Sequence, residues 1–313
     1  MKIATGFLSF AAAAILPSLS MAITTFSVLS NNVYFLNELI SPDWGQQTRA
    51  KLIAESDYIK GHDVIVLQEC FSKRACDILR EGLRSQYPYQ TPTLGVSKEG
   101  WDSTSGYYHW SVPLNGGVVI MSKWPITQKH QYVFKNGCAS EWFQNKGFAY
   151  AVLNYQGKNV HVFGTHMQSD DSACLPGQPA RYRGQALDAW RSYIDSLNIP
   201  ANELVIMAGD FNIKRDTEEF SSMLKRLNAT QPTVYDGHPW TWDTQTNEIA
   251  RYNYPDLIPE YLDFVVTDKE HLAVKSSVQT TLKVQSPEYH IKGAAYHEYS
   301  DHYPVKTVIE ADL

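Results

Sequence analysis

Two residues near the C-terminus, Asp301 and His302, stand side by side just before an apolar segment that is typical of a β-strand. A histidine side chain titrates near neutral pH and can take a proton from water, while the neighbouring carboxylate can bind a metal ion. Taken alone, the pair also fits an ordinary polar loop. Further polar residues upstream each follow a strand-like apolar segment: Asn32, Glu69, His166, Asp210, Asn212 and Asp263. Because open α/β folds bind ligands at the ends of their strands, we expect these side chains to meet in one site.

A metal site is predicted at Glu69, which ends the strand-like segment 63–68. Mg²⁺ prefers oxygen ligands and is commonly held by one or two carboxylates together with water and substrate phosphate. We therefore expect Mg²⁺ at Glu69, with Asn32 and Asp301 beside it, and with Mn²⁺ or Co²⁺ as alternative ions. The alternatives at these positions are a surface acid for Glu69 and a turn residue for Asn32.

Three residues are suited to stabilising a phosphoryl group. Asp210 and Asn212 follow the segment 204–208 at alternate positions, so an extended chain would place both side chains on one side. They could hold an attacking water or a phosphoryl oxygen, although an Asx turn is the alternative. His166 follows the segment 159–164, and its imidazole could stabilise charge on phosphorus. A lone histidine at such a place is otherwise structural.

Asp263 interrupts an apolar strand-like segment, residues 261–267. A carboxylate in that position needs a partner, because burying an unpaired charge is unfavourable. A hydrogen bond from His302 would satisfy the carboxylate, fix the imidazole tautomer and raise its basicity. The residues therefore predict His302 as a general base that is oriented by Asp263.

The elements that would position these residues are indicated by alternating apolar and polar patterns. Strands are expected at residues 23–29, 63–67, 116–121, 127–134, 147–154, 159–164, 204–208, 261–267, 276–283 and 305–310. Helices are expected at residues 48–59, 76–87 and 218–227 and in a long segment after Pro179. Antiparallel runs of strands interrupted by helices predict an α/β sandwich of two mixed, mainly antiparallel sheets packed face to face, with helices outside, in one domain of residues 23–313.

Residues 1–22 have the features of a secretory signal peptide. Lys2 is followed by a short apolar segment and by Ser20-Met21-Ala22, with small residues at the positions that signal peptidase requires. We expect a secreted chain beginning near Ile23. The 313-residue sequence has a formal net charge of −6, and loss of Lys2 makes the exported chain more acidic. This charge disfavours nonspecific binding to nucleic acid, so no nucleic-acid partner is expected.

The four cysteines could pair in three ways if all are oxidised in an exported protein. We favour Cys138 with Cys174 and Cys70 with Cys76. The second pair would require α-carbons within about 7 Å of each other. If that requirement is not met, Cys70 is expected to be an inert buried thiol.

The segment 98–113 fits no regular element and is rich in aromatic residues, namely Trp101, Tyr107, Tyr108 and Trp110. Aromatic side chains with a polar tip are suited to a membrane interface or to a quaternary ammonium group. The segment is therefore a candidate for membrane contact, with a loop folded onto its own rings as the alternative.

The polar residues at the strand ends resemble the site of the endonuclease/exonuclease/phosphatase superfamily, typified by pancreatic-type deoxyribonuclease. Five motifs carry the resemblance: Leu67-Gln68-Glu69, Gly164-Thr165-His166, Gly209-Asp210-Phe211-Asn212, Tyr261-Leu262-Asp263 and Ser300-Asp301-His302. A closer resemblance, over nearly the whole exported chain, is to the secreted bacterial neutral sphingomyelinases. It rests on Asn32-Val33-Tyr34, Asn115-Gly116-Gly117-Val118, Ser122-Lys123-Trp124-Pro125-Ile126, Asn145-Lys146-Gly147-Phe148, Cys138 with Cys174, Tyr252-Asn253-Tyr254-Pro255-Asp256 and Tyr299 to Val305.

The resemblance implies a four-layer, deoxyribonuclease-like fold and the Mg²⁺-dependent hydrolysis of membrane sphingomyelin to ceramide and phosphocholine, in some relatives as a haemolytic toxin. It implies that His302 activates water for in-line attack on phosphorus, and that Asp301 positions metal or phosphate. We expect a monomer. A secreted nuclease on the same fold and a non-enzymatic membrane-binding toxin module are the alternatives.

Two departures from the bacterial sphingomyelinases are expected. Their second, peripheral metal ligands align with Lys73, Leu114 and Asn115, and neither a cation nor an apolar group can bind Mg²⁺. Their long aromatic-tipped hairpin before the last strand is shortened here to the segment 286–299, which has no Trp-Phe tip. Membrane docking is therefore expected to be weaker or to move to residues 101–110.

Overall fold

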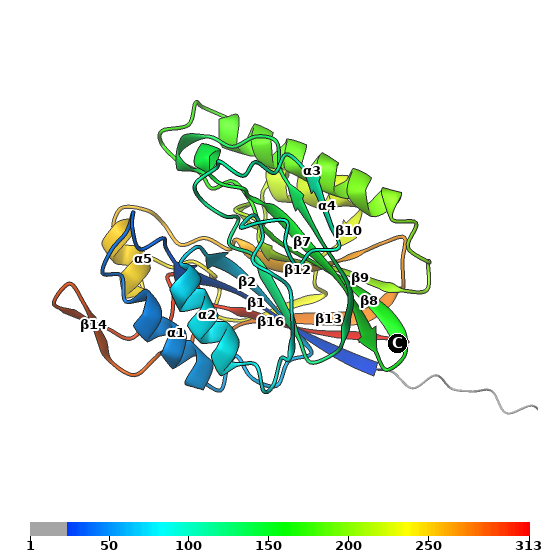
Figure 1. Cartoon of the computed structure of the whole chain (residues 1–313), viewed down its shortest axis with the longest axis horizontal. Helices are drawn as coiled ribbons and strands as arrows, with labels where there is room; N and C mark the ends of the chain where they lie inside the picture. Colours follow the sequence, from blue (N-terminus) through cyan, green and yellow to red (C-terminus); the bar gives the residue numbers. More distant parts are fainter. Residues whose placement is uncertain (1–23) are drawn as a thin grey trace, which may run out of the picture.

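The computed structural model describes residues 24–313, and the predicted signal peptide lies outside the described residues. Two seven-stranded sheets form the centre of the molecule (Figure 1). The first sheet contains, in spatial order, β11 (Val234–Gly237), β13 (Val274–Thr281), β16 (Val305–Ala311), β1 (Thr24–Phe35), β2 (Val64–Cys70), β5 (Val119–Ser122) and β3 (Tyr89–Gln90). Within it, β1 pairs parallel with β2 and antiparallel with β16.

The second sheet has the same mixed character. It contains, in spatial order, β10 (Ala229–Thr230), β12 (Asp263–Asp268), β9 (Leu204–Asp210), β8 (Lys158–His166), β7 (Gly147–Tyr155), β6 (Ile126–Val133) and β4 (Ser103–Gly106). Here β8 pairs parallel with β9, whereas β9 and β12 are antiparallel. A separate hairpin is formed by β14 (Tyr289–Ile291) and β15 (Ala294–Tyr296).

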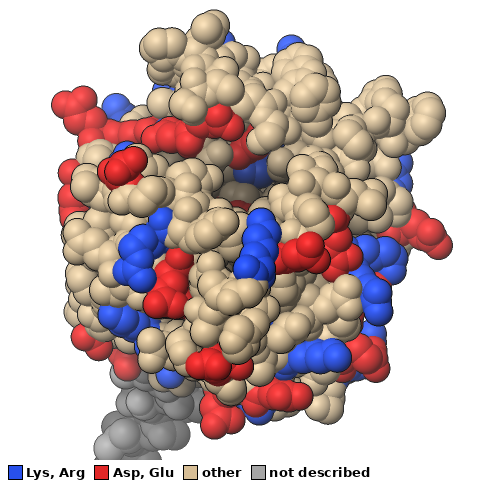
Figure 2. All heavy atoms as spheres, turned by 90° about the vertical axis from the view of Figure 1, so that its left-hand side faces the viewer, with Lys and Arg blue, Asp and Glu red and all other residues tan. Residues whose placement is uncertain are grey.

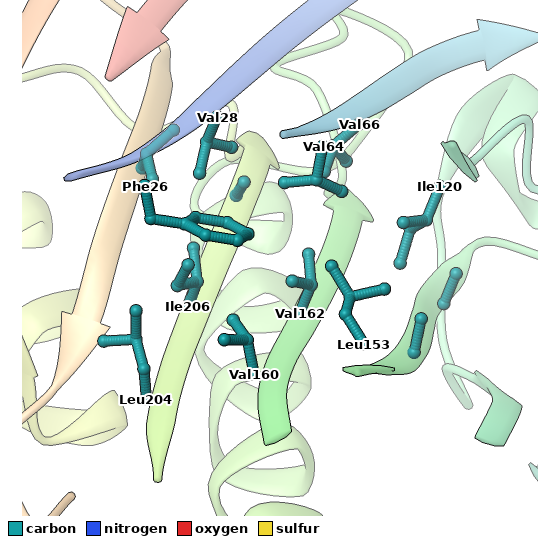
Figure 3. Packing of buried hydrophobic residues seen from close by; sticks show 14 of the residues in the cluster. Phe26, Val28, Val64, Val66, Ile120, Leu153, Val160, Val162, Leu204 and Ile206 are labelled. Atoms are coloured by element: carbon teal, nitrogen blue, oxygen red, sulfur yellow. The ribbon is translucent and has the colours of Figure 1, made fainter. Parts of the chain in front are cut away.

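The two sheets bury one apolar layer between them (Figure 3). Phe26, Val28 and Val66 from the first sheet pack against Val162 and Ile206 from the second. Strands that are buried on both faces need continuous apolar sequence, which explains why residues 64–67 and 204–208 do not alternate with polar residues. This layer keeps the ends of β1, β2, β8 and β9 close together.

Helices cover both outer faces, so the molecule has four layers (Figure 1). Helices α1 (Gln46–Glu55) and α2 (Lys73–Gly82) pack on the first sheet. Helices α3 (Gln178–Ser196) and α4 (Glu218–Leu227) pack on the second. A short helix α5 (Glu248–Asn253) and the 3₁₀ turn η1 (Ala139–Phe143) lie outside the layers. The predicted sandwich of two mixed, mainly antiparallel sheets flanked by helices is confirmed.

Most expected elements are present with shifted ends. Helix α2 begins three residues earlier than expected, because the Ser72 hydroxyl caps it by accepting a hydrogen bond from the Ala75 amide at 3.2 Å. The segment 98–113, expected to be irregular, contributes β4, which pairs parallel with β6. Among the described residues, no helix is long and apolar enough to cross a membrane.

The disulfide predictions have different outcomes. Cys138 and Cys174 are bonded, as expected. The pairing of Cys70 with Cys76 is wrong, because both are free thiols buried in the apolar layer between β2 and α2. Burial raises the pKa of the Cys70 thiol well above its usual value, which is the behaviour of an inert buried cysteine.

Candidate active site

The fold brings the predicted residues together at one edge of the sandwich. Asn32, Glu69, His166 and Asp210 lie at or near the C-terminal ends of β1, β2, β8 and β9. Asp263 begins β12, and because β12 is antiparallel to β9 its first residue is paired with Asp210 at the same edge. The edge faces α5 and the β14–β15 hairpin, at the left of Figure 1.

Asn32 joins the two sheets at this edge. Its fully buried amide nitrogen donates hydrogen bonds to Glu69 Oε1 and to Asp210 Oδ2, both at 3.0 Å. Its amide oxygen accepts from the Tyr34 backbone N–H. Glu69 itself has a positive φ of 58°, a conformation that costs energy for a residue other than glycine and that turns its carboxylate into the site.

His302 and Asp263 form the predicted pair. The Nδ1 atom of His302 donates to Asp263 Oδ2 at 2.9 Å. This leaves Nε2 as the possible proton acceptor, and it lies 3.7 Å from Asp210 Oδ2 with no hydrogen-bond partner among residues 24–313. Thr241 connects the two segments that carry this pair. Its hydroxyl accepts a hydrogen bond from the Asp263 amide, and its carbonyl accepts one from the amide of Tyr303, the residue after His302.

His166 is a second imidazole that lies beside the carboxylates. Its Nε2 is 3.9 Å from Glu69 Oε1, 3.7 Å from Asp210 Oδ2 and 3.2 Å from Lys146 Nζ. Lys146 was not predicted to have a role, although it belongs to one of the motifs that carried the resemblance. A lysine in sequence gives no sign that it will be buried, because lysine side chains are usually exposed.

Asn212 does not extend the strand as predicted. Strand β9 ends at Asp210, and Asn212 adopts a left-handed conformation with φ of 52°. The Asn212 amide donates to Asp210 Oδ1 at 2.9 Å, which is the Asx turn named as the alternative. The side chain of Asn212 donates to the carbonyl of Met167, so it remains at the site edge beside His166.

The carboxylates at this edge raise one another's pKa. Burial and the charge of Asp301 raise the pKa of Glu69 to about 7, and burial with Asp263 raises that of Asp210 to about 7. Burial also raises the pKa of Asp301. For His302, burial lowers the pKa, but Asp263 and Asp210 outweigh it and hold the pKa well above its usual value. The site therefore has an excess of negative charge that a bound cation would relieve.

The donor set fits a hard divalent cation. Four carboxylates, those of Glu69, Asp210, Asp263 and Asp301, supply oxygen ligands, which is the chemistry that Mg²⁺ prefers. Asn32 turns its amide nitrogen, and not its oxygen, toward two of them. Asp263 Oδ1 is buried and has no partner among the described residues. Donor atoms of Asp210, Asp263 and His302 lie within 4.8 Å of one another, close enough to surround one ion.

This geometry agrees with the comparisons with known proteins. A model of the endonuclease/exonuclease/phosphatase family matches residues 29–302. The chain belongs to this family.

Two relatives and one solved structure of the family define its similarity further. The chain is 43% identical to a phospholipase C of Staphylococcus aureus, over 90% of this chain and 87% of the relative. It is 42% identical to a sphingomyelinase C of Bacillus cereus, over 91% of this chain and 89% of the relative. A crystal structure of a mutant beta toxin from Staphylococcus aureus with bound magnesium ions has a TM-score of 0.89 and 43% identity, over 91% of this chain and 99% of that one.

A second buried cation, Arg49, lies near this edge and was not predicted from the sequence to have a role. Arg49 is fully buried and donates to the backbone carbonyls of Val33, Tyr34, Trp44 and Tyr299. It thereby ties the loop after β1 to the loop that carries Asp301. The periodic pattern of residues 48–59 predicted a helix but assigned no function to its arginine.

The aromatic segment is only partly placed as expected. Tyr107 and Trp110 are 55% and 82% exposed, and Tyr108 is half-buried. The prediction that Trp101 contacts the membrane is wrong, because its ring is 8% exposed and packs into the apolar layer between the sheets. An isolated sequence cannot show which of several neighbouring aromatics fills a core.

Other apolar side chains are exposed in loops that follow strands at the active-site edge or flank it. They are Leu39, Ile40, Trp142, Phe143, Leu257 and Ile258. Figure 2 shows this end of the molecule, with a hollow in which acidic and basic atoms are visible and with mostly uncharged atoms above it.

The β14–β15 hairpin turns at Lys292-Gly293 and buries Tyr289, Ile291 and Tyr296 against Tyr34 and Trp44. Its tip therefore presents a lysine and a glycine instead of aromatic rings.

Proposed function

We propose that this protein is a secreted, Mg²⁺-dependent phosphodiesterase that hydrolyses sphingomyelin to ceramide and phosphocholine. The observation that supports it best is the strand edge at which an oriented imidazole, whose Nε2 has no hydrogen-bond partner among the described residues, lies beside a buried set of carboxylates. The similarity to a sphingomyelinase C over nine-tenths of the chain selects the substrate. We propose that residues 23–313 act as one catalytic domain, as a monomer, on membrane surfaces.

Each step of the hydrolysis can be assigned to residues of this chain. Nε2 of His302 accepts a proton from water, while Asp263 holds Nδ1 and stabilises the imidazolium that forms. The water oxygen bonds to phosphorus on the side opposite the ceramide oxygen, and the bond to the ceramide oxygen breaks. The ceramide oxygen takes a proton from solvent water and the imidazolium of His302 returns its proton to solvent, which completes the release of ceramide and phosphocholine.

The remaining residues stabilise the charge that develops on the phosphoryl group. Glu69 and Asp301 would hold the Mg²⁺, with Mn²⁺ or Co²⁺ as substitutes, and Asn32 would orient Glu69 through the hydrogen bond from its amide nitrogen. The ion, when bound, supplies Lewis-acid polarisation of a phosphoryl oxygen. Asp210 and Asn212, linked by the Asx turn, are proposed to orient the water and a phosphoryl oxygen. His166 is proposed to contribute its neutral ring to the wall of the pocket, because burial and Lys146 lower its pKa well below the usual value.

Phosphocholine release from sphingomyelin vesicles tests the proposal directly. We expect release with Mg²⁺ and its loss when a chelator is added. Activity that survives complete chelation would contradict the metal dependence. Plasmid nicking without phosphocholine release would favour the nuclease alternative, and vesicle binding without hydrolysis would favour the non-enzymatic toxin module.

Membrane contact through Tyr107, Tyr108 and Trp110 remains part of this proposal. A Trp110→Ala variant should bind sphingomyelin vesicles less tightly while it hydrolyses a soluble phosphocholine ester as fast as the wild type. Equal loss on both substrates would show that the segment supports the catalytic site instead. A Trp142→Ala variant offers a matched comparison, because Trp142 is another exposed tryptophan, 63% exposed.

A further inference from the structure

Lys146 is an unusual feature of the active-site edge because it is a buried ammonium group. Its side chain is 8% exposed, and Lys146 is the residue directly before β7. It donates to Met167 O at 3.0 Å and to His166 Nε2 at 3.2 Å, and it lies 2.7 Å from Glu141 Oε1. An ammonium group has three donors, and all three have partners here. Lys146 therefore has no donor left for a ligand.

The contact with His166 determines where the proton of that ring lies. An ammonium group can only donate, so Nε2 of His166 must be the acceptor. In a neutral imidazole the other nitrogen, Nδ1, then carries the hydrogen. This matters because Nε2 is the nitrogen nearest to Glu69 and Asp210, at 3.9 Å and 3.7 Å. A hydrogen on Nε2 would allow His166 to donate to one of these carboxylates.

We infer that Lys146 is a positioning residue that keeps His166 from donating to Glu69 and Asp210, and so leaves Glu69 free to hold a divalent cation and Asp210 free to orient the water. The inference rests on the proposed function only for the divalent cation at this edge, and not for the substrate. The arrangement of Lys146, His166 and the two carboxylates holds for any metal-dependent reaction at this edge.

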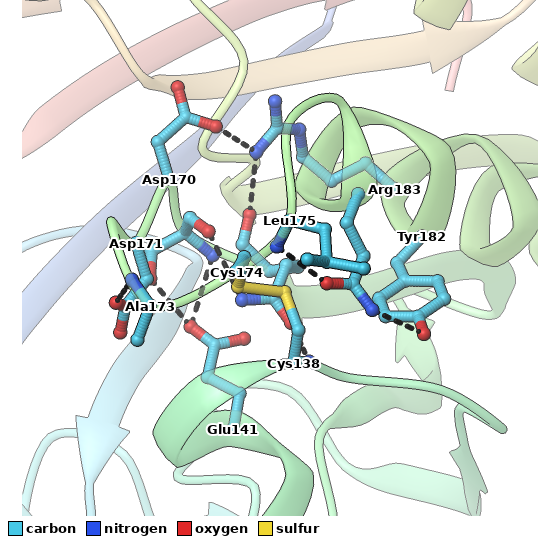
Figure 4. Close-up of a disulfide and its surroundings, with 12 residues drawn as sticks. Cys138, Glu141, Asp170, Asp171, Ala173, Cys174, Leu175, Tyr182 and Arg183 are labelled. Atoms are coloured by element: carbon cyan, nitrogen blue, oxygen red, sulfur yellow. Dashed lines mark hydrogen bonds and ion pairs between the residues drawn. A yellow bond between two sulfur atoms is a disulfide. The ribbon is translucent and has the colours of Figure 1, made fainter.

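Glu141 holds the ammonium in place from the other side. Its carboxylate is buried, and Oε1 also accepts from the amide and the hydroxyl of Ser169 at 3.0 Å and 2.8 Å. Glu141 lies in η1, immediately after Cys138, and Ser169 lies in the segment that leads to Cys174. The disulfide joins these two segments, as Figure 4 shows with Glu141 beside it. A connected series of contacts therefore runs from the disulfide through Glu141 and Lys146 to His166.

A purely structural ion pair is the competing explanation. Buried ion pairs contribute little net stability compared with apolar groups of similar size, so a structural role would appear as a change in folding stability alone. A positioning role predicts changes in the His166 tautomer and in metal affinity as well. Substitutions around a metal ligand typically cost about 10- to 100-fold in metal affinity or activity.

The test compares Lys146→Met with the wild type and with Lys158→Met, which changes an exposed lysine at the start of β8. Nitrogen chemical shifts of His166 report the tautomer, and calorimetric titration with Mg²⁺ alone reports the cation affinity. For Lys146→Met we expect the hydrogen to move to Nε2 and the affinity for Mg²⁺ to fall about 10- to 100-fold. Lys158→Met should match the wild type in both measurements, and Lys146→Arg should restore the Nδ1–H tautomer.

An unchanged tautomer together with an unchanged Mg²⁺ affinity in Lys146→Met would overturn the inference. If that variant does not fold, Glu141→Gln replaces it, because glutamine keeps an acceptor for Ser169 while removing the charge beside Lys146. It should weaken Mg²⁺ binding in the same direction by a smaller factor, and wild-type affinity in Glu141→Gln would then overturn the inference. Neither readout uses sphingomyelin, so a wrong substrate assignment would leave this test intact.

Discussion

The histidine–carboxylate pairs of His302 and of His161 contact opposite ends of the second sheet, and of these two only the pair of His302 can accept a proton from a ligand. His302 and Asp263 lie at the active-site edge, whereas His161 and Glu203 lie near the starts of β8 and β9 at the opposite end. At His161 both nitrogens are used: Nε2 donates to Glu203 Oε2, and Nδ1 accepts from the Tyr150 hydroxyl at 2.7 Å. At His302 only Nδ1 is used.

The surroundings of the two rings lead to opposite shifts in pKa. Burial lowers the pKa of His161, even though the bond to Glu203 acts in the other direction. For His302, burial also lowers the pKa, but the charges of Asp263, Asp210 and Asp301 outweigh this effect and raise the pKa. A histidine bonded to a carboxylate is therefore not by itself a catalytic base. The additional carboxylates that converge from other strands, together with a free Nε2, are what distinguish the active-site pair.

The largest difference between the two pairs should appear when each histidine is replaced by glutamine. His302→Gln removes the proton acceptor, so kcat for phosphocholine release should fall by about 10⁴-fold, the upper range for general base catalysis. His161→Gln should retain nearly all the activity, because it lies at the far end of the sheet. Rates measured under saturating Mg²⁺ test this, and circular dichroism verifies that both variants are folded. Comparable loss of activity in the two variants would contradict the distinction.

Replacement of the two carboxylates should give a smaller difference of the same kind. Asp263→Asn keeps the shape of the side chain but no longer fixes the His302 tautomer, so kcat should fall by about 10²- to 10³-fold. Glu203→Gln is the matched control and should change kcat by less than about twofold, because Glu203 lies at the end of the sheet opposite the active site. An Asp263→Asn enzyme as active as the control would show that His302 does not need its partner.

The Tyr150 hydroxyl offers a test of the second pair through stability. Tyr150→Phe leaves Nδ1 of the buried His161 without its partner, which should lower the free energy of unfolding by about 1 to 3 kcal/mol. The rate of hydrolysis should be unchanged. Urea denaturation measures the first quantity, and an unaltered midpoint would mean that the hydrogen bond contributes nothing to stability.

The smallest expected effect is the pH dependence that arises from His161. Its native pKa lies below the value of about 6.5 that a histidine has in an unfolded chain. The unfolded chain therefore binds this proton more readily, and the stability contributed by neutral His161 is complete above about pH 6.5 and declines as the pH falls through that value. The decline ends below the native pKa. Nuclear magnetic resonance titration of the ring measures the shift directly, and a pKa of 6.5 or higher would contradict it.

Much of the active site could be predicted from sequence because its residues follow buried strands. The ends of β2, β8 and β9 are visible as apolar segments that stop at Glu69, His166 and Asp210, and strand ends on one edge of a sheet must meet. The pairing of Asp263 with His302 could be inferred from the cost of an unpaired carboxylate in an apolar strand. These inferences depend on local sequence and on one general rule of topology.

The features that could not be predicted depend on contacts between distant segments. Arg49 is a buried cation whose partners are all backbone carbonyls, and a carbonyl leaves no signature in sequence. Lys146 binds one carbonyl and two side chains, Glu141 and His166, that lie at other places in the sequence. Cys70 and Cys76 are close in sequence, but both are free thiols buried in an apolar layer. Their spacing alone cannot distinguish two buried thiols from a disulfide. Trp101 fills the core while Trp110 is exposed, although both occur in the same aromatic segment.

Hydrolysis of sphingomyelin in water enriched in ¹⁸O tests the central claim most directly. If His302 activates water for attack on phosphorus, mass spectrometry should find one ¹⁸O in the phosphocholine and none in the ceramide. Incorporation of ¹⁸O into the ceramide would mean that a carbon–oxygen bond is cleaved, and it would contradict the proposed chemistry at this site.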